Sequence, residues 1–133
     1  MSLGAALAGF EGRITPISID QTPADNFVDE VTQIAAAAAE LLEVDVALPE
    51  QQTTLCYGYL GDGYGVVGDL ERSAIRLAAQ TEGLLVGPVY TGRALGGLID
   101  LVGRGVIDPN ETVLFWHTGD ESALHAYANE LCR

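Results

Sequence analysis

The stretch Gly87-Pro88-Val89-Tyr90-Thr91-Gly92-Arg93 decides how this chain folds. It follows a short apolar run at residues 84–86 and leads directly into an apolar pattern with helical spacing. This arrangement predicts a loop that delivers Tyr90 and Thr91 to the N-terminus of a helix. A turn of this kind can hold an anionic or aromatic ligand, because unpaired backbone N–H groups at a helix N-terminus favour anions.

A second junction with the same logic lies at residues 115–120, Phe-Trp-His-Thr-Gly-Asp. An apolar segment is followed there by Thr118, Gly119 and the capping residue Asp120, after which another helical pattern begins. In an open α/β sheet, ligands collect at the carboxyl ends of the strands, where such turns converge. We therefore expect the two junctions to face one crevice.

Strand-like and helix-like patterns alternate along the rest of the chain. The predicted strands span residues 14–20, 53–59 and 112–116, the last of them buried, and the predicted helices span residues 22–43, 69–81, 91–102 and 121–132. Between residues 58 and 68, five glycines predict an irregular loop around Tyr64. Because glycine is conformationally permissive, this loop would let the Tyr64 ring approach a ligand closely, although the ring could equally pin its own loop.

Apolar residues three and four positions apart define the faces that each predicted helix buries. The predicted buried residues are Phe27, Val31, Ile34, Ala38, Leu41 and Leu42 in the first long helix, Leu70, Ala74, Leu77 and Ala78 in the second, Leu95, Leu98, Ile99 and Val102 in the third, and Leu124, Tyr127 and Leu131 in the last. Glu71, Arg72 and Arg76 are interpreted as a solvated face. Gly96 and Gly97 each lower helix propensity by about 1 kcal/mol, so we expect close helix packing to offset them.

Length and composition indicate one domain and exclude several classes of protein. The chain has 133 residues, of which 48% are hydrophobic and 19% charged, which is typical of a folded globular protein. No apolar run approaches the roughly 20 residues of a membrane span and no basic segment precedes an apolar one, so we predict neither a membrane helix nor a signal peptide, and a cytoplasmic location. Cys56 and Cys132 alone do not indicate a disulfide framework.

The charge balance is strongly acidic. Nineteen Asp and Glu residues against six basic ones give a formal net charge of -13, which disfavours nucleic acid and anionic membranes as partners. All six basic residues are arginine, and the chain contains no lysine. An acidic, alanine-rich and lysine-free composition is also what a salt-loving or GC-rich source would give.

Several ordered blocks between Gly63 and Tyr127 resemble a known enzyme family. The blocks are Gly63-Tyr64-Gly65-Val66, Glu82-Gly83-Leu84-Leu85, Pro88-Val89-Tyr90-Thr91-Gly92-Arg93-Ala94, Gly97-Leu98-Ile99, Val113-Leu114-Phe115 and His117-Thr118-Gly119. Together they resemble the C-terminal part of the D-cysteine desulfhydrase and 1-aminocyclopropane-1-carboxylate deaminase family, which belongs to the fold-type II pyridoxal-phosphate (PLP) enzymes. Residues 1–133 then correspond to a single domain, the C-terminal portion of the large domain. Met1–Leu3 resemble an expression start, because the similarity begins near Gly4.

The resemblance implies an α/β fold, a three-layer sandwich with a mostly parallel sheet that forms part of the tryptophan synthase β-like PLP fold. It also implies PLP as the cofactor and a small amino acid as the substrate, which the family converts to a keto acid and ammonia. Tyr90 is the best candidate for a catalytic nucleophile or general acid/base, with Tyr64 as a second catalytic ring. Thr91 and Thr118 match positions near the pyridine nitrogen, and Gly119 keeps the backbone close to the ring.

Gly4, Ala5 and Ala6 match the family's phosphate-binding loop only in part. The residues from Gly4 to Phe10 predict a small-residue turn that feeds a short helix, a place where backbone N–H groups can meet a phosphate. Ala5 stands where the family has a glycine and Ala6 where it has a threonine, so one hydroxyl contact is lost. The alternative interpretation is that these small residues only pack a helix against a strand. Asp120 is a further departure, because it places a carboxylate where the family has a second glycine.

The missing lysine limits what the chain can do alone. PLP chemistry of this class starts from a Schiff base with a lysine amine, and arginine cannot replace it because it stays protonated. We therefore expect an inactive fragment that supplies part of the cofactor pocket, with an exposed sheet edge or apolar face that favours self-association. The alternative is a non-catalytic binding or assembly module that completes a site with a separate lysine-bearing chain.

No metal site is predicted from the sequence. His117 and His125 lack the spacing of a helical zinc motif, and neither a Cys-x-x-Cys nor a His-Glu-x-x-His pattern accompanies them. Both histidines are interpreted as structural.

Overall fold

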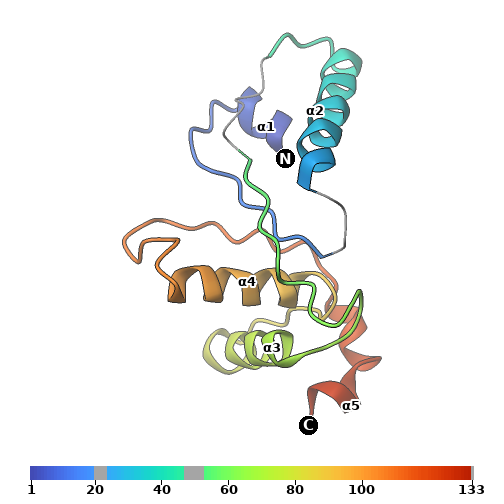
Figure 1. Ribbon diagram of the computed structural model, residues 1–133, viewed down its shortest axis with the longest axis vertical. Coiled ribbons are helices and arrows are strands. Elements are labelled where there is room, and N and C mark those ends of the chain that lie inside the picture. The colour runs from blue at the N-terminus through green and yellow to red at the C-terminus, as the bar shows by residue number, and fades with distance from the viewer. Residues whose placement is uncertain (20–23, 47–52, 133) are drawn as a thin grey trace. The chain divides into compact units, whose positions relative to one another are not determined.

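The computed structural model of the chain describes residues 1–19, 24–46 and 53–132, and within them the regular structure is helical (Figure 1). The elements are α1 (Ser2–Leu7), α2 (Ala24–Leu41), α3 (Asp69–Glu82), α4 (Thr91–Gly103), a 3-10 helix η1 (Glu121–His125) and α5 (Ala128–Leu131). The contacts divide the chain into two units. Unit 1 contains the described residues of Met1–Pro16 and Gln21–Cys56, and unit 2 those of Ile17–Asp20 and Tyr57–Arg133. The single domain predicted for residues 1–133 stays a prediction.

Unit 1 brings α1, α2 and two extended segments together. Ile14 and Thr53 form an isolated parallel bridge, and the backbone N–H groups of Thr54 and Cys56 donate to the carbonyl oxygens of Ile14 and Pro16 at 3.1 and 2.8 Å. The two segments predicted as strands at 14–20 and 53–59 therefore pair in parallel at their described residues. The pairing is too short to form a strand of a sheet within the described parts of the chain.

One expectation for the start of unit 1 is wrong. Gly4, Ala5 and Ala6 lie inside α1 rather than in a turn before a helix, and the turn follows at Ala8 and Gly9. The cause is that alanine favours helix, whereas Gly9 at φ +64° ends it.

In α2, the predicted buried stripe is only partly buried. Ile34, Leu41 and Leu42 are exposed, whereas Ala35 is the buried residue. The periodicity gave the correct kind of element, but it could not show what covers the apolar face. Thr22 and Pro23, which we predicted to begin the helix, lie outside the described residues. No helix in the described parts of the chain is both long and apolar enough to cross a membrane.

Unit 2 is built on the packing of α3 against α4, which lie side by side in Figure 1. The two helices approach closely because glycines of α4 face α3. A Cβ atom at Gly96 would lie 2.6 Å from Cγ of Leu70, and one at Gly92 would lie 3.0 Å from Ile75 and 2.7 Å from the carbonyl oxygen of Gly87. The expectation that close packing offsets the helix cost of Gly96 is therefore confirmed, and Gly92 plays the same part.

The core of unit 2 gathers around three buried residues, Ile75, Ala78 and Val86. Leu95, Phe115, Leu124 and Leu131 pack against them, so α3, α4, the extended segment at 112–116 and the C-terminal helices share one core. The face that α4 buries differs from the prediction. Its buried residues are Thr91, Gly92, Arg93, Gly96, Gly97 and Leu101, whereas Ile99 and Val102 are exposed.

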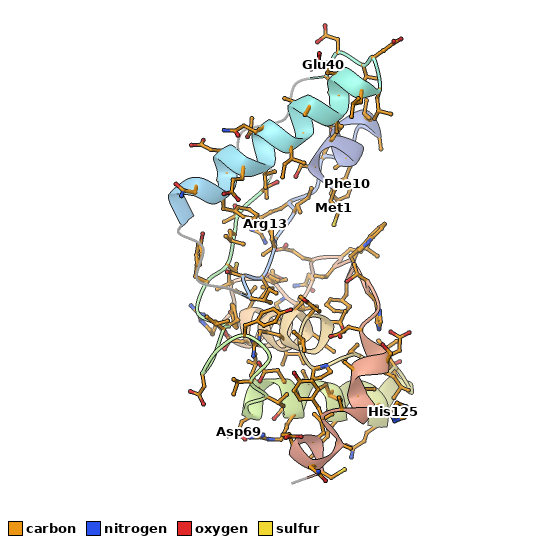
Figure 2. The ribbon with its side chains drawn as sticks, turned by 90° about the vertical axis from the view of Figure 1, so that its right-hand side faces the viewer. Met1, Phe10, Arg13, Glu40, Asp69 and His125 are labelled. Atoms are coloured by element: carbon orange, nitrogen blue, oxygen red, sulfur yellow. The ribbon has the colours of Figure 1, made fainter. Side chains whose placement is uncertain are left out.

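Helix α3 buries a carboxylate that the sequence placed in solvent. Glu71 is only 2% exposed, so its assignment to a solvated face with Arg72 and Arg76 is wrong. Asp69 is the first residue of this helix, after the N-cap residue Gly68, and its side chain lies at the surface of the molecule (Figure 2). Leu77, predicted on the inner face, is 48% exposed. Helical periodicity assigns charged residues to solvent, but Glu71 can be buried because a buried cation compensates its charge.

The predicted strand at 112–116 is extended but not buried. Val113, Leu114 and Trp116 are 44%, 77% and 59% exposed, and only Phe115 turns toward the core. The described residues contain no β-strand, so the mostly parallel sheet expected for the fold stays a prediction. The final helix, predicted to be continuous from 121 to 132, is broken into η1 and α5, but Leu124 and Leu131 face the core as predicted.

We predict that Gly92→Ala destabilises the chain by about 1–3 kcal/mol, because the added methyl group meets both the backbone and Ile75. Gly103→Ala is the matched control, since nothing lies within 4 Å of its position in the same helix. The control should be neutral or slightly stabilising, because alanine favours helix. Urea unfolding followed by circular dichroism measures both changes. Equal stability of the two variants would contradict the close packing of α3 and α4.

The pH dependence of stability should contain a contribution from Asp100. Its carboxylate accepts hydrogen bonds from Tyr59 at 2.7 Å and Arg104 at 3.2 Å, which together lower the pKa of Asp100 below its ordinary value of 3.8. Ionised Asp100 therefore stabilises the fold above pH 3.8, and this stabilisation disappears as the pH falls through the lowered pKa.

We predict that Asp100→Asn lowers the unfolding free energy at about pH 6 and has no such effect at about pH 2. Urea unfolding of both proteins at each pH measures the difference. If the difference in unfolding free energy between the two proteins were the same at the lower pH, ionisation of Asp100 would not be its cause.

Candidate functional site

Two tyrosine side chains meet at the surface of unit 2. The hydroxyl groups of Tyr64 and Tyr90 are hydrogen-bonded to each other, and their rings pack edge to face with centroids 6.0 Å apart and planes at 68°. Both side chains are exposed, Tyr64 at 59% and Tyr90 at 43%. The structure therefore brings together the two residues that the sequence singled out as catalytic candidates, and leaves their hydroxyl groups open to a ligand.

The hydrogen bond with Tyr90 also affects proton binding. It is the main cause that raises the pKa of Tyr64 above its ordinary value of 10.0, with desolvation as the next cause. Tyr64 therefore stays a protonated phenol at neutral pH and can donate a hydrogen bond. This direction is opposite to that of a tyrosine activated as a nucleophile, so Tyr64 in this chain is suited to act as a donor.

Tyr90 is fixed in place by the loop on which it lies. It is the N-cap residue of α4, and the residue that follows it, Thr91, is 2% exposed. The Thr91 hydroxyl accepts a hydrogen bond from the backbone N–H of Gly87 at 2.8 Å and donates to the carbonyl oxygen of Gly119 at 3.1 Å. This hydroxyl therefore ties the loop before α4 to the junction at 115–120.

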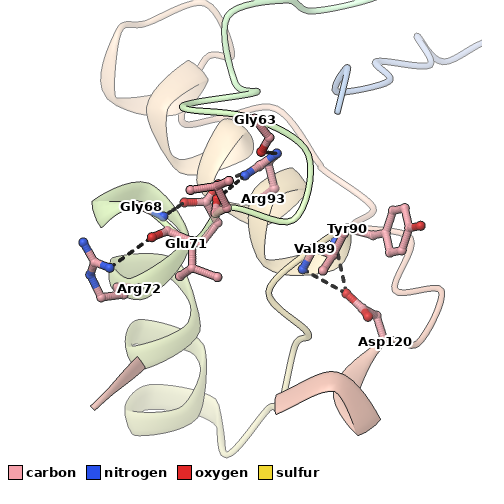
Figure 3. Close-up of polar contacts among 10 residues, drawn as sticks. Gly63, Gly68, Glu71, Arg72, Val89, Tyr90, Arg93 and Asp120 are labelled. Carbon is pink, nitrogen blue, oxygen red and sulfur yellow. Dashed lines mark hydrogen bonds and ion pairs between the residues drawn. The ribbon is translucent and has the colours of Figure 1, made fainter. Parts of the chain in front are cut away.

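Asp120 makes the second hydrogen-bonded connection between the two junctions. Its Oδ2 atom accepts hydrogen bonds from the backbone N–H groups of Val89 and Tyr90 at 3.1 and 3.0 Å (Figure 3). The backbone of Asp120 also lies where a Cβ atom at Gly87 would be, so no larger residue fits there without a shift. The two junctions are therefore in contact, and the crevice that we expect both of them to face stays a prediction. The carboxylate that departs from the family pattern binds backbone amides of its own chain.

His117 fixes the conformation of the second junction. Its Nε2 atom lies 2.9 Å from the carbonyl oxygen of Leu85, and its Nδ1 atom accepts a hydrogen bond from the backbone N–H of Gly119 at 3.1 Å. This pairing requires a neutral ring with its proton on Nε2. The structural role expected for His117 is confirmed. In the described part of the chain, no three His, Cys, Asp or Glu side chains gather closely enough to hold a metal ion.

The loop that carries Tyr64 is held by a buried ion pair. Arg93 of α4 is 0% exposed, and its Nε atom lies 2.5 Å from Oε1 of Glu71 in α3. Its two terminal nitrogens donate to the carbonyl oxygens of Gly63 at 3.3 Å and Val66 at 2.7 Å, on either side of Tyr64 (Figure 3). The other carboxylate oxygen of Glu71 accepts a hydrogen bond from the backbone N–H of Gly68 at 2.8 Å.

Sequence reasoning missed this ion pair, although one signal was present. Glu71 stands three residues after Gly68, the N-cap residue of α3, which is the spacing at which a glutamate reaches back to the N-cap N–H. The acidic residue also suits the positive end of the helix dipole. Nothing in the pattern pointed to Arg93 as its partner.

The remaining predicted cofactor residues lie in different places. Thr118 is exposed and Gly119 half-buried in the second junction of unit 2, and Thr91 is buried against backbone groups. Gly4, Ala5 and Ala6 lie in α1 of unit 1. Their contacts with a cofactor stay predictions.

Comparison with known proteins gives the class to which this arrangement belongs. Residues 2–119 match the family described as pyridoxal-phosphate dependent enzyme. The chain belongs to this family, whose cofactor is PLP.

Relatives of the chain include 1-aminocyclopropane-1-carboxylate deaminases. The chain is 38% identical over 128 residues to that of Burkholderia vietnamiensis (strain G4 / LMG 22486) and 37% identical over 128 residues to that of Rhizobium rhizogenes (strain K84 / ATCC BAA-868). Each match covers 96% of this chain and 38% of the relative. A solved structure described as an ACC deaminase homologue matches 98% of this chain and 38% of its own, with a TM-score of 0.81 and 30% identity. This likeness supports the fold-type II architecture predicted from the sequence.

The side chains of unit 2 fit one wall of a PLP site. Two exposed phenol hydroxyls next to each other can contact an aromatic cofactor or its substrate, and hydrogen bonds from both flanking loops hold Tyr90 in position. The chain does not contain the lysine amine that such a site requires. The residues present therefore fit the part of the pocket that contacts the cofactor without a covalent bond.

We predict that Asp120→Ala frees the loop before α4, because two backbone N–H groups lose a charged acceptor. A hydrogen bond to a charged group contributes about 1.5–3 kcal/mol, and both bonds end on the same oxygen atom, so we expect a combined loss of about 2 kcal/mol in stability. Amide hydrogen exchange should become faster at Val89 and Tyr90. The control is Asp120→Asn, which keeps an oxygen acceptor and should retain most of the protection of both amides. Unchanged exchange at Val89 and Tyr90 in Asp120→Ala would contradict the account, because it would show that these amides do not depend on the side chain at position 120.

Proposed function

We propose that these 133 residues supply the tyrosine-bearing wall of a PLP pocket in an enzyme similar to 1-aminocyclopropane-1-carboxylate deaminase or D-cysteine desulfhydrase. The observation that carries the proposal is the hydrogen-bonded pair Tyr64 and Tyr90, with both side chains exposed. The family match supports PLP as the cofactor, and the deaminase relatives support a small amino acid as the substrate.

The lysine that holds the cofactor must come from other polypeptide. None of the six basic residues carries a primary amine, and a guanidinium group stays protonated and is a poor nucleophile. We infer that this chain alone is inactive, and that it completes a site with a lysine-bearing segment. The exposed side chains of Val113, Leu114 and Trp116 support such an assembly, because they form apolar surface that further polypeptide could cover.

The same assembly would also complete the predicted sheet. The extended apolar segments at 84–86 and 112–116 are the candidates for strands of the mostly parallel sheet in a three-layer sandwich. Such strands need neighbours on both sides to satisfy their backbone groups.

PLP, when bound, supplies an electron sink for the substrate's α-carbon. The two tyrosines would then take part in hydrogen bonding and proton transfer. Tyr64 keeps its proton at neutral pH, because its pKa is raised by Tyr90, and so serves as a hydrogen-bond donor. Tyr90, held at the helix N-terminus through its own backbone N–H and the Thr91 hydroxyl, presents its hydroxyl as the nucleophile or general acid/base.

The test is reconstitution of the complete site. The chain is co-expressed with a lysine-bearing N-terminal segment of a deaminase relative that ends before the part matched here. Release of ammonia and keto acid is measured with 1-aminocyclopropane-1-carboxylate and with D-cysteine. We predict product only when both polypeptides and PLP are present.

In the reconstituted enzyme, we predict that Tyr90→Phe lowers kcat by about 100-fold or more, because proton transfer by a positioned side chain contributes at least that much. Tyr57→Phe is the matched control, since it removes a phenol hydroxyl from the same chain outside the tyrosine pair. The proposal would be wrong if the chain alone released product, or if Tyr90→Phe and Tyr57→Phe were equally active.

A further inference from the structure

The ion pair Glu71–Arg93 connects the two segments that carry the tyrosine pair. Arg93 is three residues after Tyr90, on the first turn of α4. Its terminal nitrogens bind the carbonyl oxygens of Gly63 and Val66, which flank Tyr64. One guanidinium group therefore joins the element that carries Tyr90 to the loop that carries Tyr64.

The loop needs such a support because its sequence gives it little stiffness. Three of its glycines, Gly61, Gly63 and Gly65, have positive φ angles of 62°, 148° and 73°, which L-residues rarely adopt. Glycine in these conformations allows a tight path but loses much conformational entropy on folding. Bonds from Arg93 to both sides of Tyr64 restrict the path to one conformation.

We propose that Glu71 and Arg93 are positioning residues for the Tyr64–Tyr90 pair, setting the distance between the two hydroxyl groups. The proposal rests on the function proposed above for that pair, but not on bound cofactor. Glu71 acts through Arg93: its Oε1 atom holds the guanidinium plane, and its Oε2 atom binds Gly68, where the loop enters α3. Neither side chain is solvent-accessible enough to touch a ligand, at 2% and 0% exposure.

The burial of the pair supports positioning over stability as its role. Two apolar side chains of similar volume commonly replace a buried ion pair without loss of stability, whereas removing one partner leaves an uncompensated charge. A flat guanidinium fork with bonds in fixed directions provides geometry that apolar side chains cannot. Replacing both residues together therefore tests whether the pair positions the loop or stabilises the fold.

The experiment compares the wild-type chain with the double variants E71M/R93M and E71Q/R93Q, all without cofactor. Tyrosine labelled with ¹³C at Cζ is followed by NMR through an alkaline titration, and Tyr64→Phe and Tyr90→Phe assign the two signals. We predict that both variants keep the wild-type circular dichroism, lose the cross-peak between the rings of Tyr64 and Tyr90, and titrate Tyr64 nearer its ordinary pKa. The exposed pair Asp100–Arg104 on the same helix provides the control Arg104→Met, which should change neither signal.

Three results would overturn the proposal. One is a folded double variant that keeps the ring cross-peak and the wild-type Tyr64 titration. Another is an equal change in Arg104→Met, which would mean that any lost charge on α4 has this effect. The last is failure of both double variants to fold, which would make the pair a requirement of the fold. Since no cofactor is present, none of these results depends on whether the chain completes a PLP site.

Discussion

The buried contact between Glu71 and Arg93 is the interaction on which the arrangement of the tyrosine pair depends. It joins α3 to α4 at their N-terminal ends and also binds the glycine-rich loop between Tyr59 and Gly68. Close approach of the helices makes the contact possible, because Gly92 and Gly96 leave no side chain between them. Each charge is compensated by its partner and by backbone groups, which is the condition under which charged side chains are tolerated in a protein interior.

A second set of interactions, all hydrogen bonds, fixes the loop before α4 to the junction at 115–120. The Thr91 hydroxyl and the Asp120 carboxylate connect the loop before α4 to residues 119–120, and His117 connects that segment to Leu85. Tyr90 lies where both sets of bonds meet, since its backbone is held by Asp120 and Arg93 follows on the same helical turn. Hydrogen bonds and an ion pair on both sides of Tyr90 thereby hold the exposed tyrosine pair, an arrangement suited to keeping reactive groups at fixed positions.

The sequence predicted the elements of unit 2 and the site better than it predicted burial. The turn chemistry at 87–93 and 115–120 correctly indicated that the two junctions meet, because capping and glycine signals are local. Burial of Glu71 and exposure of Leu114 and Ile34 could not be predicted, because they depend on partners far away in the chain or on surfaces that single-sequence periodicity does not show. Asp120 illustrates the same limit: the sequence showed only that a carboxylate replaces a glycine of the family, and the structure shows that it accepts hydrogen bonds from two backbone amides.

The central claim is that this chain contributes the tyrosine wall of a PLP pocket whose covalent anchor lies on other polypeptide. The most direct measurement is borohydride reduction of the chain mixed with PLP and a lysine-bearing segment of a deaminase relative, followed by peptide mass spectrometry. The expected result is a pyridoxyl group on a lysine of the added segment and none on any side chain of these 133 residues. A pyridoxyl adduct on the N-terminal amine of this chain, or equal labelling of the added segment's lysine when this chain is left out, would contradict the claim.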